Sequence, residues 1–143
     1  MALLYIESVE EMDLEEMQKT HEDEITLLND IDKLAITYSI QKSEETLQTL
    51  EKKIEQYLEH VKVHFANEER LMRQYDFPHY QMHKTAHDMF LSDLEMSVTQ
   101  WRAYGNIEKI INFIRKAPEW IVLHINTVDA PTASFLASNI EKN

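Results

Sequence analysis

The sequence predicts an all-α protein, an up-down-up-down four-helix bundle with an N-terminal arm. Only one glycine and three prolines occur among its 143 residues, too few for a fold rich in tight turns. Four segments repeat apolar residues at spacings of three and four, which is typical of helices with one buried face. Short connections between such helices favour antiparallel neighbours, and hence a bundle.

Composition narrows the class of protein further. The formal net charge of −12 argues against nucleic acid or an anionic membrane surface as a partner. The absence of cysteine excludes disulfides and thiolate ligands. No run approaches the roughly 20 apolar residues of a membrane span, and the N-terminus lacks the basic region of a signal peptide. We therefore expect one domain over residues 1–143, soluble and cytoplasmic.

The N-terminal part should combine an irregular arm with a first helix. Residues 1–12 are expected to pack their few apolar side chains across the bundle. The helix is predicted over residues 13–38, with acidic residues on its outer face. Its inward stripe includes a histidine and consists of Met17, His21, Ile25, Leu28, Ile31 and Ala35.

The second helix is predicted over residues 44–75, with Ser43 as its N-cap. Its apolar stripe contains one carboxylate and consists of Ile54, Leu58, Val61, Phe65, Glu68 and Met72. A buried carboxylate is costly without a partner, so Glu68 needs one. Glu69 is rotated from it by about 100° and is expected to face solvent.

The second half of the chain should hold two more helices. The sequence YDFPHY suits a tight turn, and a third helix is predicted over residues 80–104 with Gly105 at its C-terminal end. The fourth begins near Ile107, and Pro118 within it predicts a kink or a short break. The tail ASFLASNIEKN is expected to add a further helical turn or two.

Two pairs of potential metal ligands flank the predicted turn. His64 and Glu68 are four residues apart, as are His83 and His87, so each pair occupies one face of its helix. The two helices are predicted to be antiparallel neighbours. The pairs should therefore face each other across the bundle, as the ligands of a metal site would.

Further ligands are predicted on the other two helices. A lone histidine on an apolar face is usually a core residue, but His21 and His124 bring the inward histidines to five. Five imidazoles leave too many buried ring nitrogens to be satisfied by protein groups alone. Asp129 follows His124 by five positions and reaches the same face only if the helix loosens or ends there. Pro131 favours this, because it cannot donate to the carbonyl of Thr127.

Other metal-site patterns fit less well. A ferritin-like di-iron bundle requires Glu-x-x-His pairs, and no histidine here follows a glutamate by three residues. The zinc-protease pattern HExxH is absent, since HKTAH has no glutamate after its first histidine. A metal site could also be built from a shifted set of pairs, His60 with His64 and His79 with His83. That site would give no role to Glu68, to His87 or to the histidine of the fourth helix. His60 and His79 are therefore expected to be exposed.

The segments HFANEERLM, HKTAH and WIVLHINTVD, with an isolated histidine before them, resemble the hemerythrins, bacterial single-domain members especially. The resemblance spans most of the chain, from His21 to Asp129. The interval from His21 to His64 is longer than in typical members, which implies an extended loop or longer helices. The resemblance implies two irons: His83, His87 and His124 bind one, His21 and His64 bind the other, and Glu68, Asp129 and an oxo or hydroxo group bridge them.

This ligand set implies an open position. Five histidines and two bridging carboxylates fill about nine of the roughly twelve positions of two octahedral irons, and the bridging oxygen fills about two more. The remaining position lies on the iron with two histidines, where O2 is expected to bind. By resemblance, the apolar pocket above it keeps water out and slows autoxidation, and is lined by Phe65, Trp120, Ile121 and Ile125.

Two functions remain open on this reading. One is reversible O2 binding for storage, delivery or sensing, with O2 as a ligand and no enzymatic activity. The alternative is a di-iron redox protein that acts on peroxide or nitric oxide, or in iron–sulfur cluster repair. The repair members usually carry an additional cysteine-bearing segment, and this chain has no cysteine. We favour oxygen binding.

Overall fold

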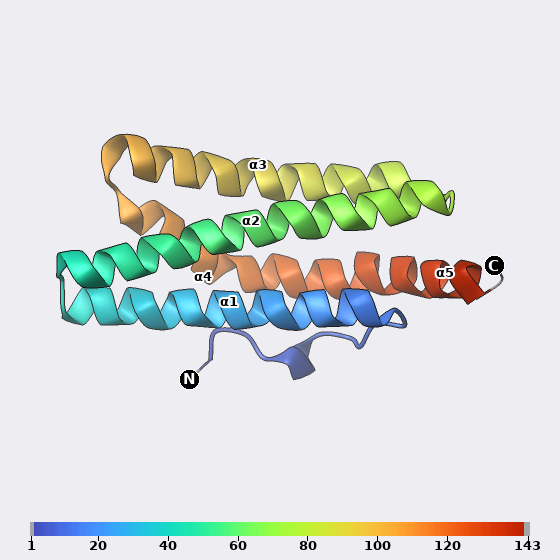
Figure 1. Ribbon diagram of the computed structural model, residues 1–143, viewed down its shortest axis with the longest axis horizontal. Coiled ribbons are helices and arrows are strands. Elements are labelled where there is room, and N and C mark those ends of the chain that lie inside the picture. The colour runs from blue at the N-terminus through green and yellow to red at the C-terminus, as the bar shows by residue number, and fades with distance from the viewer. Residues whose placement is uncertain (1, 142–143) are drawn as a thin grey trace.

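The computed structural model describes residues 2–141 and shows four long antiparallel rods with a short arm alongside (Figure 1). The first three rods are single helices, and the fourth is continuous through three elements. They are α1 (Glu15–Ile40), α2 (Glu44–Gln74), α3 (Tyr80–Tyr104), and α4 (Ile107–His124) followed by the π-helix η2 (Ile125–Asp129) and α5 (Ala130–Glu141). The described residues include no strand. The predicted all-α, up-down-up-down bundle is confirmed.

The helices pack in a ring around one core. Helix α1 packs against α2 and α4, and α3 packs against the same two helices from the other side. Helix α5 returns to α2 near the end at which α2 meets α3 (Figure 1). The predicted stripe of α1 is buried throughout, and so is that of α2, Glu68 included. This core holds the four inward faces together.

Local signals at the helix ends act as the sequence predicts. The Ser43 hydroxyl accepts from the backbone N–H of Thr46, and the Thr46 hydroxyl accepts from the N–H of Ser43, which forms a capping box. Gly105 has a left-handed conformation (φ 68°) and donates its N–H to the Trp101 carbonyl. Because α1 and α2 are 26 and 31 residues long, longer helices rather than an extended loop account for the interval between His21 and His64.

The fourth rod is helical over a longer stretch than predicted. Helix α4 runs from Ile107 to His124 with Pro118 inside it, so of the kink or short break expected at Pro118, the break is wrong. The tail continues as helix to Glu141, which exceeds the predicted turn or two. Residues 142–143 of that prediction lie outside the described part of the chain.

The N-terminal arm is held against the bundle by buried side chains and specific hydrogen bonds. Leu4 is buried, and its backbone N–H and carbonyl pair with the side-chain amide of Asn29 at 2.9 and 2.8 Å. The N–H of Glu10 donates to the Asn126 side chain at 2.8 Å. The arm, which includes the short 3-10 helix η1 (Ile6–Ser8), is therefore tied both to α1 and to the π-helix.

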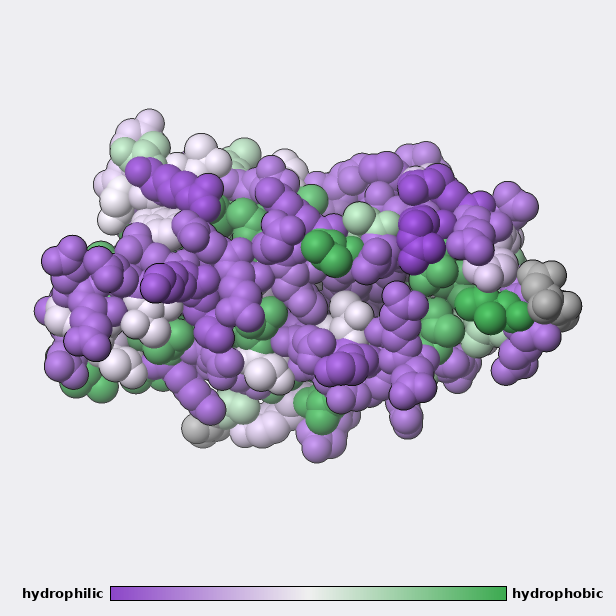
Figure 2. All heavy atoms as spheres, in the orientation of Figure 1, coloured by the Kyte–Doolittle hydropathy of each residue, from purple (hydrophilic) through white to green (hydrophobic). Residues whose placement is uncertain are grey.

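The surface is largely hydrophilic. Figure 2 shows polar side chains covering most of one face, with apolar ones in small separate groups. Within residues 2–141, no helix is both long enough and apolar enough to cross a membrane.

Candidate metal centre

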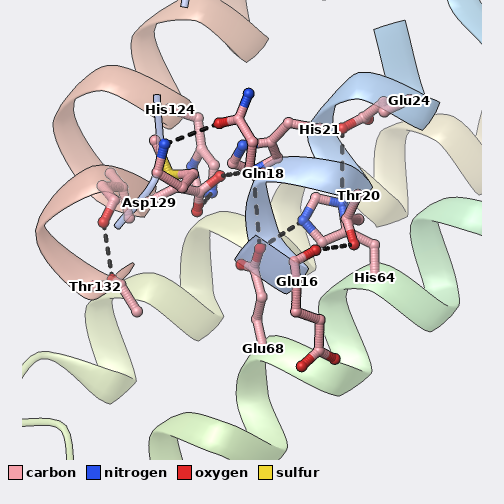
Figure 3. A network of polar contacts seen from close by, with 12 residues as sticks. Glu16, Gln18, Thr20, His21, Glu24, His64, Glu68, His124, Asp129 and Thr132 are labelled. Atoms are coloured by element: carbon pink, nitrogen blue, oxygen red, sulfur yellow. Dashed lines mark hydrogen bonds and ion pairs between the residues drawn. The ribbon is translucent and has the colours of Figure 1, made fainter. Parts of the chain in front are cut away.

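The structure brings all seven predicted ligands together between the rods, and each of them is buried. They form two groups that share Asp129, and within each group the potential ligand atoms lie within 4.8 Å of one another. Figure 3 shows part of this cluster. The first group consists of His83, His87, His124 and Asp129, and the second of His21, His64, Glu68 and Asp129.

A π-helix explains how Asp129 reaches the cluster. In η2 the N–H of Ala130 donates to the carbonyl of Ile125, five residues back. This wider turn places residues five apart on one face, so that Asp129 Oδ1 lies 3.0 Å from His124 Nε2. The loosening of the helix that the spacing required is therefore present.

The two carboxylates each face both groups. Glu68 Oε1 lies 3.3 and 3.2 Å from the Nε2 atoms of His83 and His87, whereas Oε2 contacts His64 Nε2. Asp129 Oδ1 lies 2.9 Å from His83 Nε2, and Oδ2 lies 3.0 Å from His21 Nε2. Each carboxylate thus has one oxygen on either side, an arrangement suited to bridging two cations.

Several of these atoms are buried without a hydrogen-bond partner among the described residues. They converge on one region of the core and comprise Nε2 of His83, His87 and His124, Oε1 of Glu68 and Oδ1 of Asp129. A buried polar atom left unsatisfied costs about 1–3 kcal/mol, so five at one place require a common partner. Imidazole nitrogens and carboxylate oxygens together suit iron and several other transition metals. The residues present therefore fit a metal centre.

Outer contacts orient two of the imidazoles. The Thr132 hydroxyl donates to the Val128 carbonyl at 2.8 Å, so it accepts from His83 Nδ1, 2.9 Å away. Glu69 Oε2 accepts from His87 Nδ1 at 3.0 Å. With the proton on Nδ1, each ring keeps the lone pair of Nε2 for the centre, as is usual for metal-binding histidines.

Three expectations about neighbouring residues need comment. Glu69 was expected in solvent, but its side chain is only 15% exposed because it pairs with His87. His60 was expected to be exposed and is half-buried, with Nε2 unpaired among the described residues. His79 is exposed as expected. The prediction for His79 is confirmed, and those for Glu69 and His60 are wrong.

The four residues predicted to line an apolar pocket are placed around the cluster. The Phe65 ring stacks on His87 with centroids 3.9 Å apart, and the Trp120 ring stacks on His124 at 4.3 Å. Ile121 and Ile125 are buried on either side of His124 in the sequence. Phe65 and Trp120 thus lie against the first histidine group, whereas the pocket was predicted above the iron of His21 and His64. Phe65 also faces the second group, with its ring centroid 5.3 Å from that of His64.

Sequence reasoning missed a third buried carboxylate, Glu24. It lies on α1 three residues after His21, and Oε1 is 3.6 Å from His64 Nδ1. Its other oxygen accepts a hydrogen bond from the buried Tyr57 hydroxyl at 3.1 Å. The spacing of three from His21 and one from Ile25 already placed Glu24 on the inward face, and this signal could have found it.

Charge pairing shifts the pKa values of the buried groups. Burial lowers the pKa of His64, but the negative charge of Glu68 and its hydrogen bond raise it by more, to about 9. Burial likewise lowers the pKa of His83, and contacts with Asp129 and Glu68 raise it to about 9. Burial raises the pKa of Glu68 and Asp129, yet the facing histidines hold both below the ordinary values of 4.5 and 3.8.

No model of a protein family matches the chain, and no solved structure does. Among known proteins, a bacteriohemerythrin of Aquifex aeolicus is 29% identical over 121 residues, which cover 84% of this chain and 87% of that protein. A bacteriohemerythrin of Ralstonia nicotianae is 30% identical over 84 residues, or 59% of this chain and 61% of that protein. Fold and site define a helical bundle whose buried histidine–carboxylate cluster could hold metal ions. In sequence, the chain is similar to these two bacteriohemerythrins.

The pKa values predict how the stability of the metal-free protein depends on pH. His64 and His83 are protonated more readily in the folded state than at the ordinary pKa of 6.5. Their contribution is fully present below pH 6.5 and is lost as the pH rises to about 9. The carboxylates contribute above pH 4.5, and this contribution is lost as the pH falls. The free energy of unfolding should therefore be largest between these limits.

Urea denaturation of metal-free protein from pH 4 to pH 9 measures this dependence. We expect a loss on the order of a few kcal/mol between pH 6.5 and 9. Metal-loaded protein is the control and should lack this loss, because its ligands are already deprotonated. Stability of the metal-free chain that stays level or rises over this range would contradict the assigned charge pairing.

Proposed function

We propose that the chain is a di-iron protein that binds O2 reversibly for storage, delivery or sensing. The observation that carries the proposal is the set of five unsatisfied buried atoms, together with two carboxylates that each face both histidine groups. Both relatives reported above are named bacteriohemerythrin, which also supports a di-iron protein that binds O2. The role is binding rather than catalysis, and O2 is the proposed ligand.

The distances support a division of the ligands between two irons. His83, His87 and His124 would hold one iron, and His21 and His64 the other. Glu68 and Asp129 would bridge them, with an oxo or hydroxo group completing the centre. When bound, such a pair of irons supplies reversible O2 binding at the position that the protein leaves open. The arm and all four rods share one core, which supports treating residues 1–143 as a single di-iron domain.

The chain's own contribution to reversibility is the exclusion of water. Phe65 and Trp120 cover the faces of His87 and His124, and Ile121 and Ile125, on the same rod as His124, are buried. An apolar surround withholds the protons and water that would promote loss of electrons from a reduced centre. We assign these four residues to the O2 pocket.

Visible absorption tests the function directly. Protein loaded with ferrous iron should develop an absorption band on exposure to O2 and lose it when O2 is removed, over repeated cycles. Rapid and irreversible conversion to the oxidised spectrum would contradict reversible binding and favour the redox alternative. The absence of any iron-dependent band would contradict the di-iron assignment itself.

Removal of one proposed ligand should reduce iron content. In His124→Ala the first histidine group loses one of three nitrogens, and Asp129 loses a facing group, so we expect one or both irons to be lost. Iron per chain, measured by elemental analysis, checks this, and His79→Ala is the control because His79 is exposed. Full iron content in His124→Ala would refute its assignment as a ligand.

A polar group in the proposed pocket should speed autoxidation without removing iron. Ile121→Thr introduces a hydroxyl one turn before His124 in a buried position. We expect two irons per chain and a severalfold faster decay of the oxygenated band. Ile114→Thr is the matched control, since Ile114 is equally buried but lies roughly 15 Å from His124 along the helix. Equal decay rates in the two variants would mean that Ile121 does not line the pocket.

A further inference from the structure

Glu24 is a buried carboxylate for which the seven proposed ligands leave no role. Only 4% of it is exposed, and it lies between α1 and α2 beside the second histidine group. A buried negative charge is costly unless something in its surroundings benefits from it. Within residues 2–141 no lysine or arginine pairs with Glu24, so its charge is not neutralised by an ordinary ion pair.

Tyr57 fixes the orientation of this carboxylate. Tyr57 is fully buried, two turns before His64 on α2, and its hydroxyl donates to Glu24 Oε2 at 3.1 Å. Burial, followed by the charge of Glu24, raises the pKa of Tyr57, so the hydroxyl keeps its proton. With Oε2 held in this way, Oε1 is turned toward His64.

The His64 ring lies between two carboxylates. Figure 3 shows Glu68 on one side of the ring and Glu24 on the other. Nε2 contacts Glu68 and faces the cluster, whereas Nδ1 lies 3.6 Å from Glu24 Oε1. Nδ1 is buried and has no hydrogen-bond partner in the described chain, so Glu24 is the group placed to receive its proton.

The groups that face Nδ1 of His83 and His87 differ from Glu24 in charge or in exposure. His83 faces the neutral hydroxyl of Thr132. His87 faces Glu69, which is partly exposed and lies 3.8 Å from Lys84. Glu24 is therefore the most buried anion behind a ring nitrogen of the cluster, and its charge is the least screened by solvent.

We propose that Glu24, held by Tyr57, is a positioning residue that directs His64 Nε2 to the metal and stabilises the oxidised centre. The proposal rests on the proposed function, because it requires iron at His21 and His64. A carboxylate behind the distal nitrogen fixes the imidazole tautomer and makes the ring a stronger donor. A buried negative charge also favours the more positive oxidation state of a nearby metal.

The test compares the wild-type chain with Glu24→Gln and Tyr57→Phe. Glu24→Gln keeps the shape and an acceptor for Tyr57 but removes the charge. We expect it to weaken ferrous iron binding at one of the two positions by roughly 10–100-fold and to shift the reduction potential to a more positive value. Tyr57→Phe should change both quantities in the same direction by a smaller amount. Anaerobic iron titration and spectroelectrochemistry provide the two readouts.

The control is Asp23→Asn, next to Glu24 on α1. It removes the same charge from a side chain that is 52% exposed and paired with Lys19, so affinity and potential should not change. Urea unfolding of the metal-free variants separates positioning from a purely structural role. Above pH 9, where His64 of the metal-free chain has lost its proton, Glu24→Gln should unfold no more readily than the wild type, because it loses a buried charge and keeps its acceptor.

Two results would overturn the role of Glu24 and leave the proposed function standing. One is a wild-type chain that binds two irons and a Glu24→Gln variant with the same affinity and potential. The other is a Glu24→Gln variant that is less stable without metal but has an unchanged potential, which assigns Glu24 a structural role. A wild-type chain that binds no iron would instead contradict the proposed function, and the inference with it.

Discussion

The structure depends on the burial of seven ionisable side chains at the point where four helical rods meet. Histidines and carboxylates are costly inside a protein unless they are paired, and removing one partner of a buried pair leaves the other uncompensated. Each rod supplies at least one member of the cluster, so no rod can slide along its neighbours without separating ring nitrogens from carboxylate oxygens. The apolar stripes hold the rods together, and the cluster sets their register.

The same constraint explains the irregular part of the fold. A regular α-helix cannot point His124 and Asp129 at one centre, because they are five residues apart. The π-helix resolves this, and Thr132 follows it by hydrogen-bonding both to His83 and to the Val128 carbonyl within η2. The arm also reaches this segment through Asn126. Several independent contacts thus stabilise this irregular stretch of the bundle.

The sequence was sufficient to predict the bundle and to nominate the seven buried side chains of the cluster. Spacings of three and four identify a buried face reliably because every neighbour on that face is apolar, and His64, Glu68, His83 and His87 stood out against this background. Ser43 and Gly105 carried helix-end signals that depend only on local geometry. These features required no knowledge of which helices are neighbours beyond the short connections.

Apart from the break at Pro118 and the length of the C-terminal helix, the errors concern residues at the edge of a buried face. Glu69 follows Glu68 in α2 and is rotated from it by about 100° around the helix axis. Whether its side chain faces water depends on how closely α3 packs against that side of α2. His87 on α3 covers it and donates its Nδ1–H to Glu69 Oε2. Glu24 was not singled out from the sequence, because its partners Tyr57 and His64 lie on another helix. Such pairs arise from packing between helices, which periodicity along one helix does not describe.

The most direct test of the account is the location of metal in the folded protein. Crystals of the iron-loaded chain, measured at the iron absorption edge, should show two separate anomalous peaks inside the bundle. One is expected beside the Nε2 atoms of His83, His87 and His124, the other beside those of His21 and His64, with both carboxylates between them. A single peak, or iron found only at the protein surface, would contradict a di-iron centre built from these seven residues.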